Sequence, residues 1–512
     1  MTKAIETLGD LLAVGAADAP ALSAPDGVPL SYAALRAQVD ATRAALVAHG
    51  IERGDRVAIV HENGPEMAAL FLGVASAAAA APLNPAYRAD EYEFYLTDLK
   101  AKLLLVPRGS TSPSSGVAAK LGVPVAHVVA RPERGAGSFD LEFADRRTTH
   151  EPRRTDASVS SPDDVALVLH TSGTTSRPKV VPQRQRNLCA SAVNVRETLA
   201  LAPSDRGMCI MPLFHIHGLV AALLAPLSVG GEICCTPGFN ALKHFEWLGK
   251  VKPTWYTGVP TMHQAILART GRNAGVVAGH RLRFIRSSSS ALPPTVIADL
   301  EQVFGVPVVE AYGMTEAAHQ MASNPLPPAS RKPGTVGRAA GPEIRVVDGK
   351  GITTPVGIQG EIVIRGRNVM TAYEADPAIN QSAFIDGWFR TGDQGVMDAE
   401  GYISITGRLK EIINRGGEKI SPREVDEIIL QHPAVHQCVT FALPHEMLGE
   451  DVAAAIVLRE GMACEGAELR KFAAERLADF KVPRKILIVA SIPVGPTGKL
   501  QRIGLAKALG LG

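Results

Sequence analysis

The sequence has few cysteines, and its charges of opposite sign almost cancel. The six cysteines show no CxxC spacing and no dense framework, so we expect reduced thiols, as in a cytoplasmic protein, rather than a disulfide scaffold. The adjacent Cys234 and Cys235 are expected to pack in a strand. With 53 basic and 51 acidic side chains the net charge is +2. This balance excludes the strong field that non-specific binding to nucleic acid or to an anionic membrane needs.

The sequence also shows no pattern typical of a targeting signal or a membrane span. The first residues, MTKAIETLGDLLAVG, predict an amphipathic helix with acidic residues rather than a signal peptide. The run MAALFLGVASAAAAAPL (67–83) is rich in alanine and has the length of a buried helix, so no membrane span is expected. The final residues, GLG, are not a peroxisomal tripeptide. We therefore expect a cytoplasmic protein that is a monomer or a homodimer.

The chain does contain a regular alternation of helical and strand-like segments. Its 512 residues exceed one ordinary core, so two or more domains are expected. Up to about residue 325, segments such as 31–50 (helical) and 56–62 (strand-like) alternate, which predicts parallel sheets covered by helices. From about 330 to 405, short β runs broken by glycine predict a small antiparallel or barrel-like unit. The predicted fold class is therefore α/β.

A compact α+β segment follows Lys410. Ser421, Pro422 and Glu424 predict a capping box, with proline at the first helical position and a helix that continues to His432. We place a domain boundary near Lys410, which predicts two domains, residues 1–409 and 410–512.

The stretch HTSGTTSRPKVVPQ (170–183) leaves an apolar strand through a turn rich in hydroxyl groups. Backbone N–H groups and hydroxyl donors in such a turn suit a phosphate, and Lys179 adds a cation. A P-loop is disfavoured because no second glycine precedes Lys179 and because Pro178 biases Arg177 away from helical geometry. The stretch therefore predicts a phosphate-binding turn of another kind.

This stretch resembles the triphosphate-binding loop of the acyl-adenylate-forming superfamily, usually TSGTTGxPKG, although Ser176 and Val180 replace two glycines and should stiffen the loop. The resemblance covers nearly the whole chain, because four further motifs of the superfamily follow in order. It implies that an acid attacks the α-phosphorus of MgATP to give acyl-AMP and diphosphate, and that a thiol, usually of coenzyme A, then displaces AMP. The four motifs are EAYGMTEAAHQM (310–321), GWFRTGD (387–393), GRLKEIINRGGEKISPRE (407–424) and PVGPTGKLQR (493–502).

The resemblance also implies roles for single residues. Lys499 would neutralise charge between the carboxylate and the α-phosphate, which Thr315 would contact, and Thr175 and Glu316 would hold Mg²⁺. Tyr312 would stack on adenine. Asp393 would accept both ribose hydroxyls, and Arg408 would reach ribose or phosphate. The full set implied to bind ATP or AMP is Thr171, Ser172, Gly173, Thr174, Thr175, Lys179, Ser289, Glu310, Ala311, Tyr312, Gly313, Thr315, Asp393, Arg408 and Lys499.

The same resemblance implies that residues 1–409 bind ATP and the acyl substrate, and that residues 410–512 form a mobile lid that rotates between the two half-reactions. Lys410 would be the hinge, and Arg415, Gly416 and Gly417 would approach the tunnel for the thiol of coenzyme A. Glycine allows a close backbone approach there. An ordinary β-turn is the alternative interpretation of the glycine pair.

Substrate choice depends on polar residues at positions where ligases for fatty or aromatic acids carry small or apolar ones. A small dicarboxylate fits such a pocket, because its second carboxylate must not be buried unpaired. The sequence around these positions resembles that of the oxalate–CoA ligases of plants and fungi. The resemblance implies that His215 gates the pocket. The predicted acyl pocket comprises His215, His217, Ser288, Ser289, Ser290, Gly313 and His319.

Two residue assignments and three other functions stay open at this stage. Arg286 is either a carboxylate clamp or a surface charge at the end of a strand. His215 and His217 would share one face of a strand, as in a metal site, but a third ligand is missing. The other functions are a ligase for malonate or a coumarate-like acid, an adenylation domain that loads a carrier protein, and an ATP-binding sensor. The sensor would be favoured if Lys499, Glu316 or Asp393 were lacking.

Overall fold

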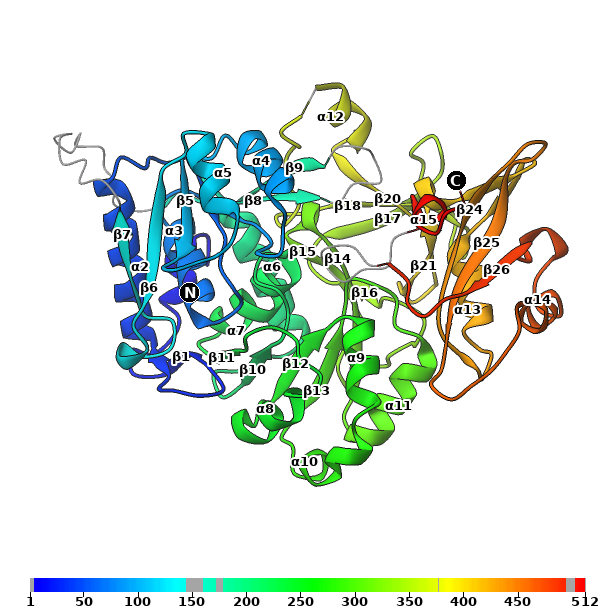
Figure 1. Cartoon of the computed structure of the whole chain (residues 1–512), viewed down its shortest axis with the longest axis horizontal. Helices are drawn as coiled ribbons and strands as arrows, with labels where there is room; N and C mark the ends of the chain where they lie inside the picture. Colours follow the sequence, from blue (N-terminus) through cyan, green and yellow to red (C-terminus); the bar gives the residue numbers. More distant parts are fainter. Residues whose placement is uncertain (1–3, 144–159, 172–177, 376, 494–501, 512) are drawn as a thin grey trace. The chain divides into compact units, whose positions relative to one another are not determined.

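The computed structural model describes residues 4–143, 160–171, 178–375, 377–493 and 502–511, which fall into two compact units (Figure 1). Unit 1 contains the chain up to Glu343 and the segment Arg365–Ser382, apart from a few residues around 175. Unit 2 contains Ile344–Ile364 and Ala383–Gly512. Among the helices described, none is long and apolar enough to cross a membrane. The domain division at 409/410 stays a prediction.

The first sheet of unit 1 is mainly parallel and has seven strands in the order β7-β6-β5-β3-β4-β8-β9. Only β7 and β9, at the two edges, pair antiparallel to their neighbours. The inner strands are short apolar runs, as expected where both faces of a sheet are covered. The strands are β3 (Arg56–Ile59), β4 (Ala79–Pro82), β5 (Leu103–Pro107), β6 (Val125–Ala130), β7 (Phe139–Phe143), β8 (Val165–Thr171) and β9 (Lys179–Arg184).

The second sheet of unit 1 has nine strands in the order β16-β15-β14-β13-β12-β10-β11-β1-β2. Its central strands, from β14 to β1, are all parallel. Both sheets therefore confirm the α/β prediction. The strands are β1 (Pro20–Ser23), β2 (Leu30–Ser31), β10 (Arg206–Cys209), β11 (Glu232–Cys235), β12 (Trp255–Gly258), β13 (Phe284–Ser287), β14 (Val308–Met314), β15 (His319–Ser323) and β16 (Arg338–Ala339).

Helices cover both faces of the nine-stranded sheet. The apolar sides of α8, α9 and α11 pack on one face, and those of α6, η2 and α7 pack on the other (Figure 1). All six cysteines are free, and Cys234 and Cys235 are buried in β11, which confirms their packing role. The helices of unit 1 are α1 (Leu8–Leu12), α2 (Tyr32–Ala48), α3 (Pro65–Ala75), α4 (Ala89–Asp98), α5 (Ser114–Lys120), α6 (Gln185–Thr198), η2 (His217–Leu224), α7 (Ala225–Leu227), α8 (His244–Val251), α9 (Pro260–Leu267), α10 (Ala274–Ala278) and α11 (Pro294–Phe304).

The alanine-rich run 67–83 is only partly helical, contrary to the prediction. The helix α3 ends at Ala75, and Ala79–Pro82 forms the buried strand β4 between β3 and β8. Alanine favours helices, but this preference is weak compared with tertiary context. Here a short strand of small side chains completes the parallel sheet.

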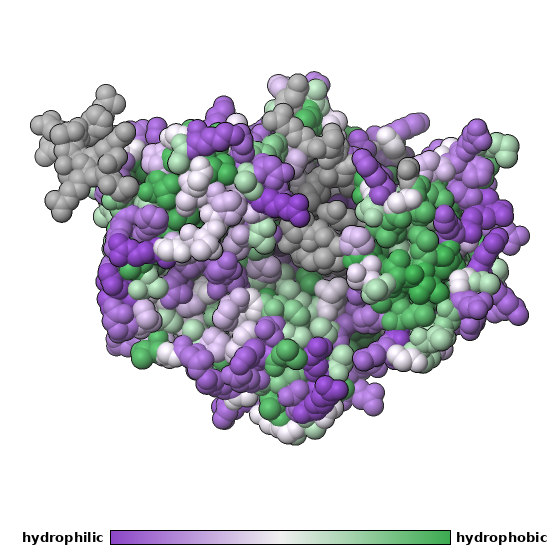
Figure 2. Space-filling model, viewed as in Figure 1, coloured by the Kyte–Doolittle hydropathy of each residue, from purple (hydrophilic) through white to green (hydrophobic). Residues whose placement is uncertain are grey.

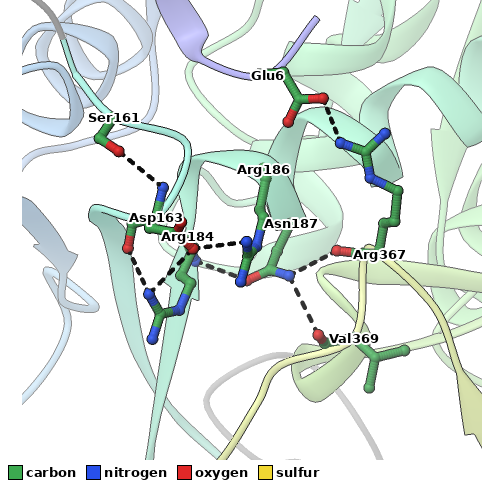
Figure 3. A network of polar contacts seen from close by, with 8 residues as sticks. All are labelled: Glu6, Ser161, Asp163, Arg184, Arg186, Asn187, Arg367 and Val369. Atoms are coloured by element: carbon green, nitrogen blue, oxygen red, sulfur yellow. Dashed lines mark hydrogen bonds and ion pairs between the residues drawn. The ribbon is translucent and has the colours of Figure 1, made fainter. Parts of the chain in front are cut away.

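The start of α6 is tied to a distant segment of unit 1 (Figure 3). The backbone N–H of Arg184 donates to Oδ1 of Asn187 at 2.9 Å, which caps the helix. The amide nitrogen of Asn187 in turn donates to the carbonyl oxygens of Arg367 and Val369 at 2.7 and 3.2 Å. The segment that carries Tyr373 is thereby fastened to α6. The network also includes ion pairs of Asp163 with Arg184 and Arg186, and of Glu6 with Arg367.

Unit 2 contains two five-stranded sheets. The first is antiparallel, as the glycine-punctuated region predicts, and the second has helices α13 and α14 packed in its core. The helix α12 (Pro377–Ala383) belongs to unit 1 except for its last residue. The elements of unit 2 are β17 (Glu343–Val347), β18 (Gly360–Arg365), β19 (Phe384–Ile385), β20 (Trp388–Met397), β21 (Ile403–Arg408), β22 (Ile413–Arg415), β23 (Glu418–Ile420), α13 (Pro422–Ile429), β24 (Val435–His445), β25 (Gly449–Leu458), α14 (Gly466–Ala474), β26 (Lys485–Ile488) and α15 (Leu505–Ala508).

The predicted capping box of α13 is wrong, although proline does occupy its first position. The hydroxyl of Ser421 donates to the carbonyl oxygen of Thr406 instead of capping the helix. The helix ends at Ile429 rather than at His432. A long-range hydrogen bond to β21 has replaced the local one that the sequence pattern favours.

A second apolar core of unit 2 lies on the other face of its second sheet. Figure 2 shows hydrophobic residues gathered on the side of this unit where Figure 1 places α15. Ile492 and Leu505 are both buried in this core, at 5% and 2% exposure, against Val439 and Phe441 of β24. The sheet therefore holds the chain on both sides of residues 494–501, which include Lys499.

Candidate functional site

The predicted phosphate-binding turn begins at the end of β8. Thr171 is the last residue of this strand and pairs with Lys179, the first residue of β9. The Nζ atom of Lys179 lies 4.3 Å from the centre of the Tyr373 ring, a cation–π contact. Lys499 and residues 172–177 of the turn lie outside the described residues. The roles of Lys499, Ser172, Gly173, Thr174 and Thr175, and the stiffening expected from Ser176, stay predictions.

The candidate magnesium ligand Glu316 is buried in the short helix η4 (Thr315–Ala317), directly after β14. Its Oε1 accepts a hydrogen bond from the hydroxyl of Tyr373 at 2.7 Å. The side-chain nitrogen of Gln183 donates to the carbonyl oxygen of Thr315 at 2.6 Å. A positioned carboxylate is the kind of ligand that Mg²⁺ prefers. Sequence reasoning missed Tyr373, because only the fold brings it to Glu316.

Four residues predicted to bind ATP or AMP, Glu310, Ala311, Tyr312 and Gly313, form one stretch of β14. The hydroxyl of Ser288 donates to the carbonyl oxygen of Ala311 at 2.9 Å, which ties the end of β13 to this stretch. Tyr312 is 8% exposed. Glu310 lines a cavity of about 250 Å³ together with Ile297, Glu301, Val308, Asn324, Arg331 and Pro333. The stretch thus borders a hollow.

The predicted ribose-binding pair lies within unit 2. Asp393 on β20 is opposite Arg408 on β21, and the Arg408 Nε lies 2.7 Å from Oδ1 of Asp393. Asp393 is buried, at 7% exposure, so this contact fixes the orientation of its carboxylate. Whether these two groups reach a nucleotide stays a prediction.

The predicted residues of the thiol tunnel lie at the turn between β22 and β23. Gly416 and Gly417 have φ angles of 59° and 98° and form a two-residue hairpin turn, which requires positive φ at both positions. Arg415 pairs with Asp451 at 2.6 Å. Lys410, the predicted hinge, lies in a single 3₁₀ turn, Leu409–Glu411. Their roles in thiol binding and domain rotation stay predictions.

A buried arginine contacts the two histidines of the predicted acid pocket that lie in η2 and β15. Arg286 on β13 is 0% exposed, so its interpretation as a surface charge is wrong. Its Nη2 donates to Nε2 of His319 at 3.0 Å and to Oε1 of Gln320 at 3.2 Å. Its Nη1 lies 3.3 Å from both Nε2 of His217 and Oγ1 of Thr257. Thr257 lies in the stretch 254–264, which the resemblance also implies to line the acyl pocket, and Gln320 lies in the motif 310–321, but the sequence did not predict that either residue contacts Arg286.

The charge of Arg286 has no acidic counterpart among the residues that the structure describes around it. Its four hydrogen-bonding partners are all neutral in the form that accepts from a guanidinium. Burial lowers the pKa of Arg286 to about 9. A buried cation without a carboxylate is costly, so this part of the fold is suited to an anion.

The two histidines stack on each other, and nearby backbone is strained. The His217 and His319 ring centres are 4.7 Å apart with an interplanar angle of 18°. Ser289, Ala318 and His319 have φ angles of 74°, 46° and 98°. Residues other than glycine rarely adopt positive φ angles. Such strain is typical of functional sites. Of the three predicted serines, Ser288 is buried, Ser289 is half-buried and Ser290 is exposed.

His215 and His217 do not lie in a strand, so they do not share the strand face that a metal site there would require. His217 begins the π-helix η2, and its backbone N–H donates to Nδ1 of His215 at 3.3 Å. A different trio in unit 2, His432, Cys464 and Glu468, has ligand atoms within 4.8 Å of one another. However, Nδ1 of His432 accepts a hydrogen bond from the backbone N–H of Ala434 at 3.3 Å. The other ring nitrogen, Nε2, lies 3.6 Å from Oε1 of Glu468. This trio therefore resembles a hydrogen-bonded surface cluster.

Comparisons with known proteins identify the family of this chain. The family of AMP-binding enzymes matches residues 12–374, and its C-terminal domain matches residues 424–499. The oxalate–CoA ligase of Arabidopsis thaliana is 42% identical over 95% of this chain and 94% of its own. The sulfoacetate–CoA ligase of Cupriavidus necator is 37% identical over 98% and 97%. The crystal structure of ATP-bound MatB from Rhodopseudomonas palustris, 29% identical, superimposes with a TM-score of 0.85 over 98% of both chains.

Proposed function

The chain belongs to the AMP-binding enzyme family and is an AMP-forming acid–thiol ligase, and we propose that the acid it activates is oxalate. Oxalate, ATP and coenzyme A would give oxalyl-CoA, AMP and diphosphate. The relative named oxalate–CoA ligase, at 42% identity, supports this choice. The main structural support for oxalate is Arg286, which is fully buried and contacts His217 and His319. Its positive charge has no acidic partner among the described residues around it.

The reaction needs positioning and charge neutralisation rather than a protein nucleophile. One carboxylate oxygen of the acid attacks the α-phosphorus, and the bond to the diphosphate breaks. The thiolate of coenzyme A then attacks the acyl carbon, and AMP leaves. Thr315 and Lys499 would meet the charge on the α-phosphate, and Glu316, held by Tyr373, would hold Mg²⁺. When bound, Mg²⁺ would neutralise phosphate charge.

A second negative group distinguishes oxalate from most other acids. An apolar chain gains nothing from the field of a buried guanidinium, whereas a second carboxylate offsets the desolvation cost of that charge. Nδ1 of His217 lies 3.0 Å from Oγ of Ser289, and the ring of His319 stacks on that of His217 with ring centres 4.7 Å apart. The pocket therefore fits a short acid with two negative ends better than a fatty or aromatic acid.

Sulfoacetate is the second candidate, because it also carries two negative groups and because the Cupriavidus relative is named for it. Malonate shares the same charge pattern with one more carbon. A coumarate-like acid lacks a second negative group. Loading of a carrier protein would leave coenzyme A without effect on turnover.

The test is diphosphate release by the full-length protein with ATP, Mg²⁺ and coenzyme A. The acids are oxalate, malonate, sulfoacetate, acetate, hexanoate and coumarate. We expect the highest kcat/KM with oxalate and little turnover with acetate, which keeps one carboxylate and lacks the second negative group. A higher kcat/KM with acetate, hexanoate or coumarate would refute the oxalate proposal and leave the ligase assignment intact.

A further inference from the structure

The junction between η4 and β15, residues 317–320, joins the two sides of the candidate site. It directly follows Glu316, the candidate magnesium ligand. At its other end, His319 and Gln320 accept hydrogen bonds from Nη2 of Arg286 at 3.0 and 3.2 Å. A shift of this junction would therefore move the metal ligand and two partners of Arg286 together.

The junction is strained and needs support from other segments. Ala318 and His319 have φ angles of 46° and 98°, and L side chains disfavour such angles sterically. A conformation of this kind persists only where the surrounding contacts hold it. Pairing with β14 holds His319 and Gln320 from one side. A second contact is needed to hold the start of the junction against its end.

The side chain of Asn368 makes that second contact. Its amide nitrogen donates to the carbonyl oxygens of Ala317 and Gln320, both at 2.8 Å. These two carbonyls lie on either side of the strained pair, and a side-chain amide has two N–H donors. Asn368 is 1% exposed, so water does not compete for these donors. Both donors of the amide therefore hold the junction closed.

We propose that Asn368 is a positioning residue that holds the junction 317–320 and thereby fixes Glu316 and the partners of Arg286 in one arrangement. Asn368 contacts no substrate in this account. The inference deepens the proposed function and rests on it for the roles of Glu316 and Arg286. It does not depend on which acid is used.

Asn368 is itself held in place by α6 (Figure 3). The amide nitrogen of Asn187 donates to the carbonyl oxygens of Arg367 and Val369, the two neighbours of Asn368, at 2.7 and 3.2 Å. Oδ1 of Asn187 is fixed in turn, because it accepts from the backbone N–H of Arg184 at 2.9 Å. The backbone on both sides of Asn368 is therefore tied to a helix, which directs its side chain to the junction.

The same segment also holds Glu316 directly. The backbone N–H of Met370 donates to the carbonyl oxygen of Glu316 at 2.8 Å, and the hydroxyl of Tyr373 donates to Oε1 of Glu316 at 2.7 Å. Asn368 holds the residues that follow Glu316. The metal ligand and the junction are thus supported by one continuous segment, Arg367–Tyr373.

The direct test measures the junction itself, without substrates. Hydrogen–deuterium exchange of a peptide covering residues 315–323 is followed by mass spectrometry in the full-length protein. Asn368→Ala should speed exchange in this peptide about 10- to 100-fold, as expected for the loss of two buried hydrogen bonds. Unchanged exchange would overturn the proposal. Because this experiment needs neither acid nor metal, failure of the positioning role is distinguishable from failure of the proposed function.

Activity supplies the second readout, with the acid that the wild type uses best. Asn368→Ala should raise both the Mg²⁺ concentration for half-maximal rate and the KM for the acid about 10-fold. Tyr373→Phe should change mainly the first and His319→Val mainly the second, because each acts on one side of the junction. A lower melting temperature with both constants unchanged would show a purely structural role and refute the proposal.

Relief of the strain should rescue the variant in part. Glycine adopts a φ near 46° without the steric cost that alanine has there. In the Asn368→Ala background, Ala318→Gly should therefore lower both constants again by about threefold or more. A loss of packing alone would not be repaired by removing a further methyl group. Absence of any recovery would contradict the claim that Asn368 acts against this strain.

Asn187→Asp tests the same contacts one step away if Asn368→Ala does not fold. It keeps the oxygen that caps α6 and removes the donors to Arg367 and Val369. Both constants should rise in the same direction, and wild-type constants would overturn the proposal. Asn273→Ala is the matched control, since this amide also donates to a backbone carbonyl, that of Arg269 at 2.9 Å, but next to α10. It should leave exchange and both constants unchanged.

Discussion

Two arginines, one in each unit, have opposite surroundings. Arg286 in unit 1 is fully buried, and the described residues around it that accept its hydrogen bonds are His217, Thr257, His319 and Gln320, none of them acidic. Arg502 in unit 2 pairs with Asp426 at 2.6 Å and with Glu411 at 3.2 Å. Both side chains are held in place by the fold, but only Arg502 has its charge balanced within the fold.

The pKa directions agree with this difference. Burial lowers the pKa of Arg286. Burial also lowers the pKa of Arg502, but Asp426 and Glu411 outweigh it and leave the pKa raised. We infer that Arg502 serves the fold of unit 2, where it holds the chain beyond Lys499, and that Arg286 serves a bound anion. Removing each arginine should therefore have opposite consequences for stability and for substrate binding.

The largest effect should come from removing Lys499, the lysine that is predicted to meet the charge on the α-phosphate, three residues before Arg502. Lys499→Ala should lower the rate of acyl-AMP formation on the order of 100-fold or more, because one charge-stabilising group is lost in the transition state. Thioester formation from supplied acyl-AMP should be affected less. The two half-reactions are measured separately, with Lys485→Ala on the exposed strand β26 as the control. Equal losses in both half-reactions would contradict the hinged lid.

The next effect concerns the stability of unit 2. Arg502→Met should lower the free energy of unfolding by about 2–3 kcal/mol, because it leaves the buried Asp426 without its cation. The estimate is below the range for fully buried pairs because the Arg502 side chain is 21% exposed. Denaturant titration measures the change. Arg476→Met, which removes an exposed cation from the same unit, should change the free energy by less than about 0.5 kcal/mol.

In unit 1, removing His319, which contacts Arg286, should weaken the use of the acid substrate and leave nucleotide binding unchanged. His319→Val should lower kcat/KM for oxalate about 10-fold or more, as expected for a lost hydrogen bond to a charged group. The KM for ATP should change little. An unchanged KM and kcat for oxalate would remove the polar-pocket argument and the role of Arg286 with it.

The smallest effect should appear at Tyr373, whose hydroxyl donates to Glu316 and whose ring lies beneath Lys179. Tyr373→Phe keeps the ring and removes the hydroxyl, so the Mg²⁺ concentration needed for half-maximal rate should rise about 10-fold at most. Tyr373→Leu should also raise the KM for ATP, because the contact with Lys179 is lost. If both variants required the same Mg²⁺ concentration as the wild type, Glu316 would not depend on Tyr373.

The sequence was sufficient to predict the α/β class, the antiparallel region and the family, because periodicity and ordered motifs are local features. It was not sufficient to place Arg286, since a lone arginine in the stretch FIRSSSSA gives no sign of its burial. Tyr373, and the contacts of Thr257 and Gln320 with Arg286, were missed for the same reason, because each contact joins residues that are distant in the chain. Strand β4 and the N-cap of α13 were mispredicted where long-range pairing outweighed local preference.

The most direct test of the central claim is the free energy of unfolding of the wild type and Arg286→Met, each measured with and without oxalate in the presence of AMP. Without oxalate, Arg286→Met should differ from the wild type by about 1 kcal/mol or be more stable, because the lost hydrogen bonds are offset by the removal of a buried charge. Oxalate should stabilise only the wild type. A variant several kcal/mol less stable than the wild type, yet stabilised by oxalate to the same extent, would contradict the account.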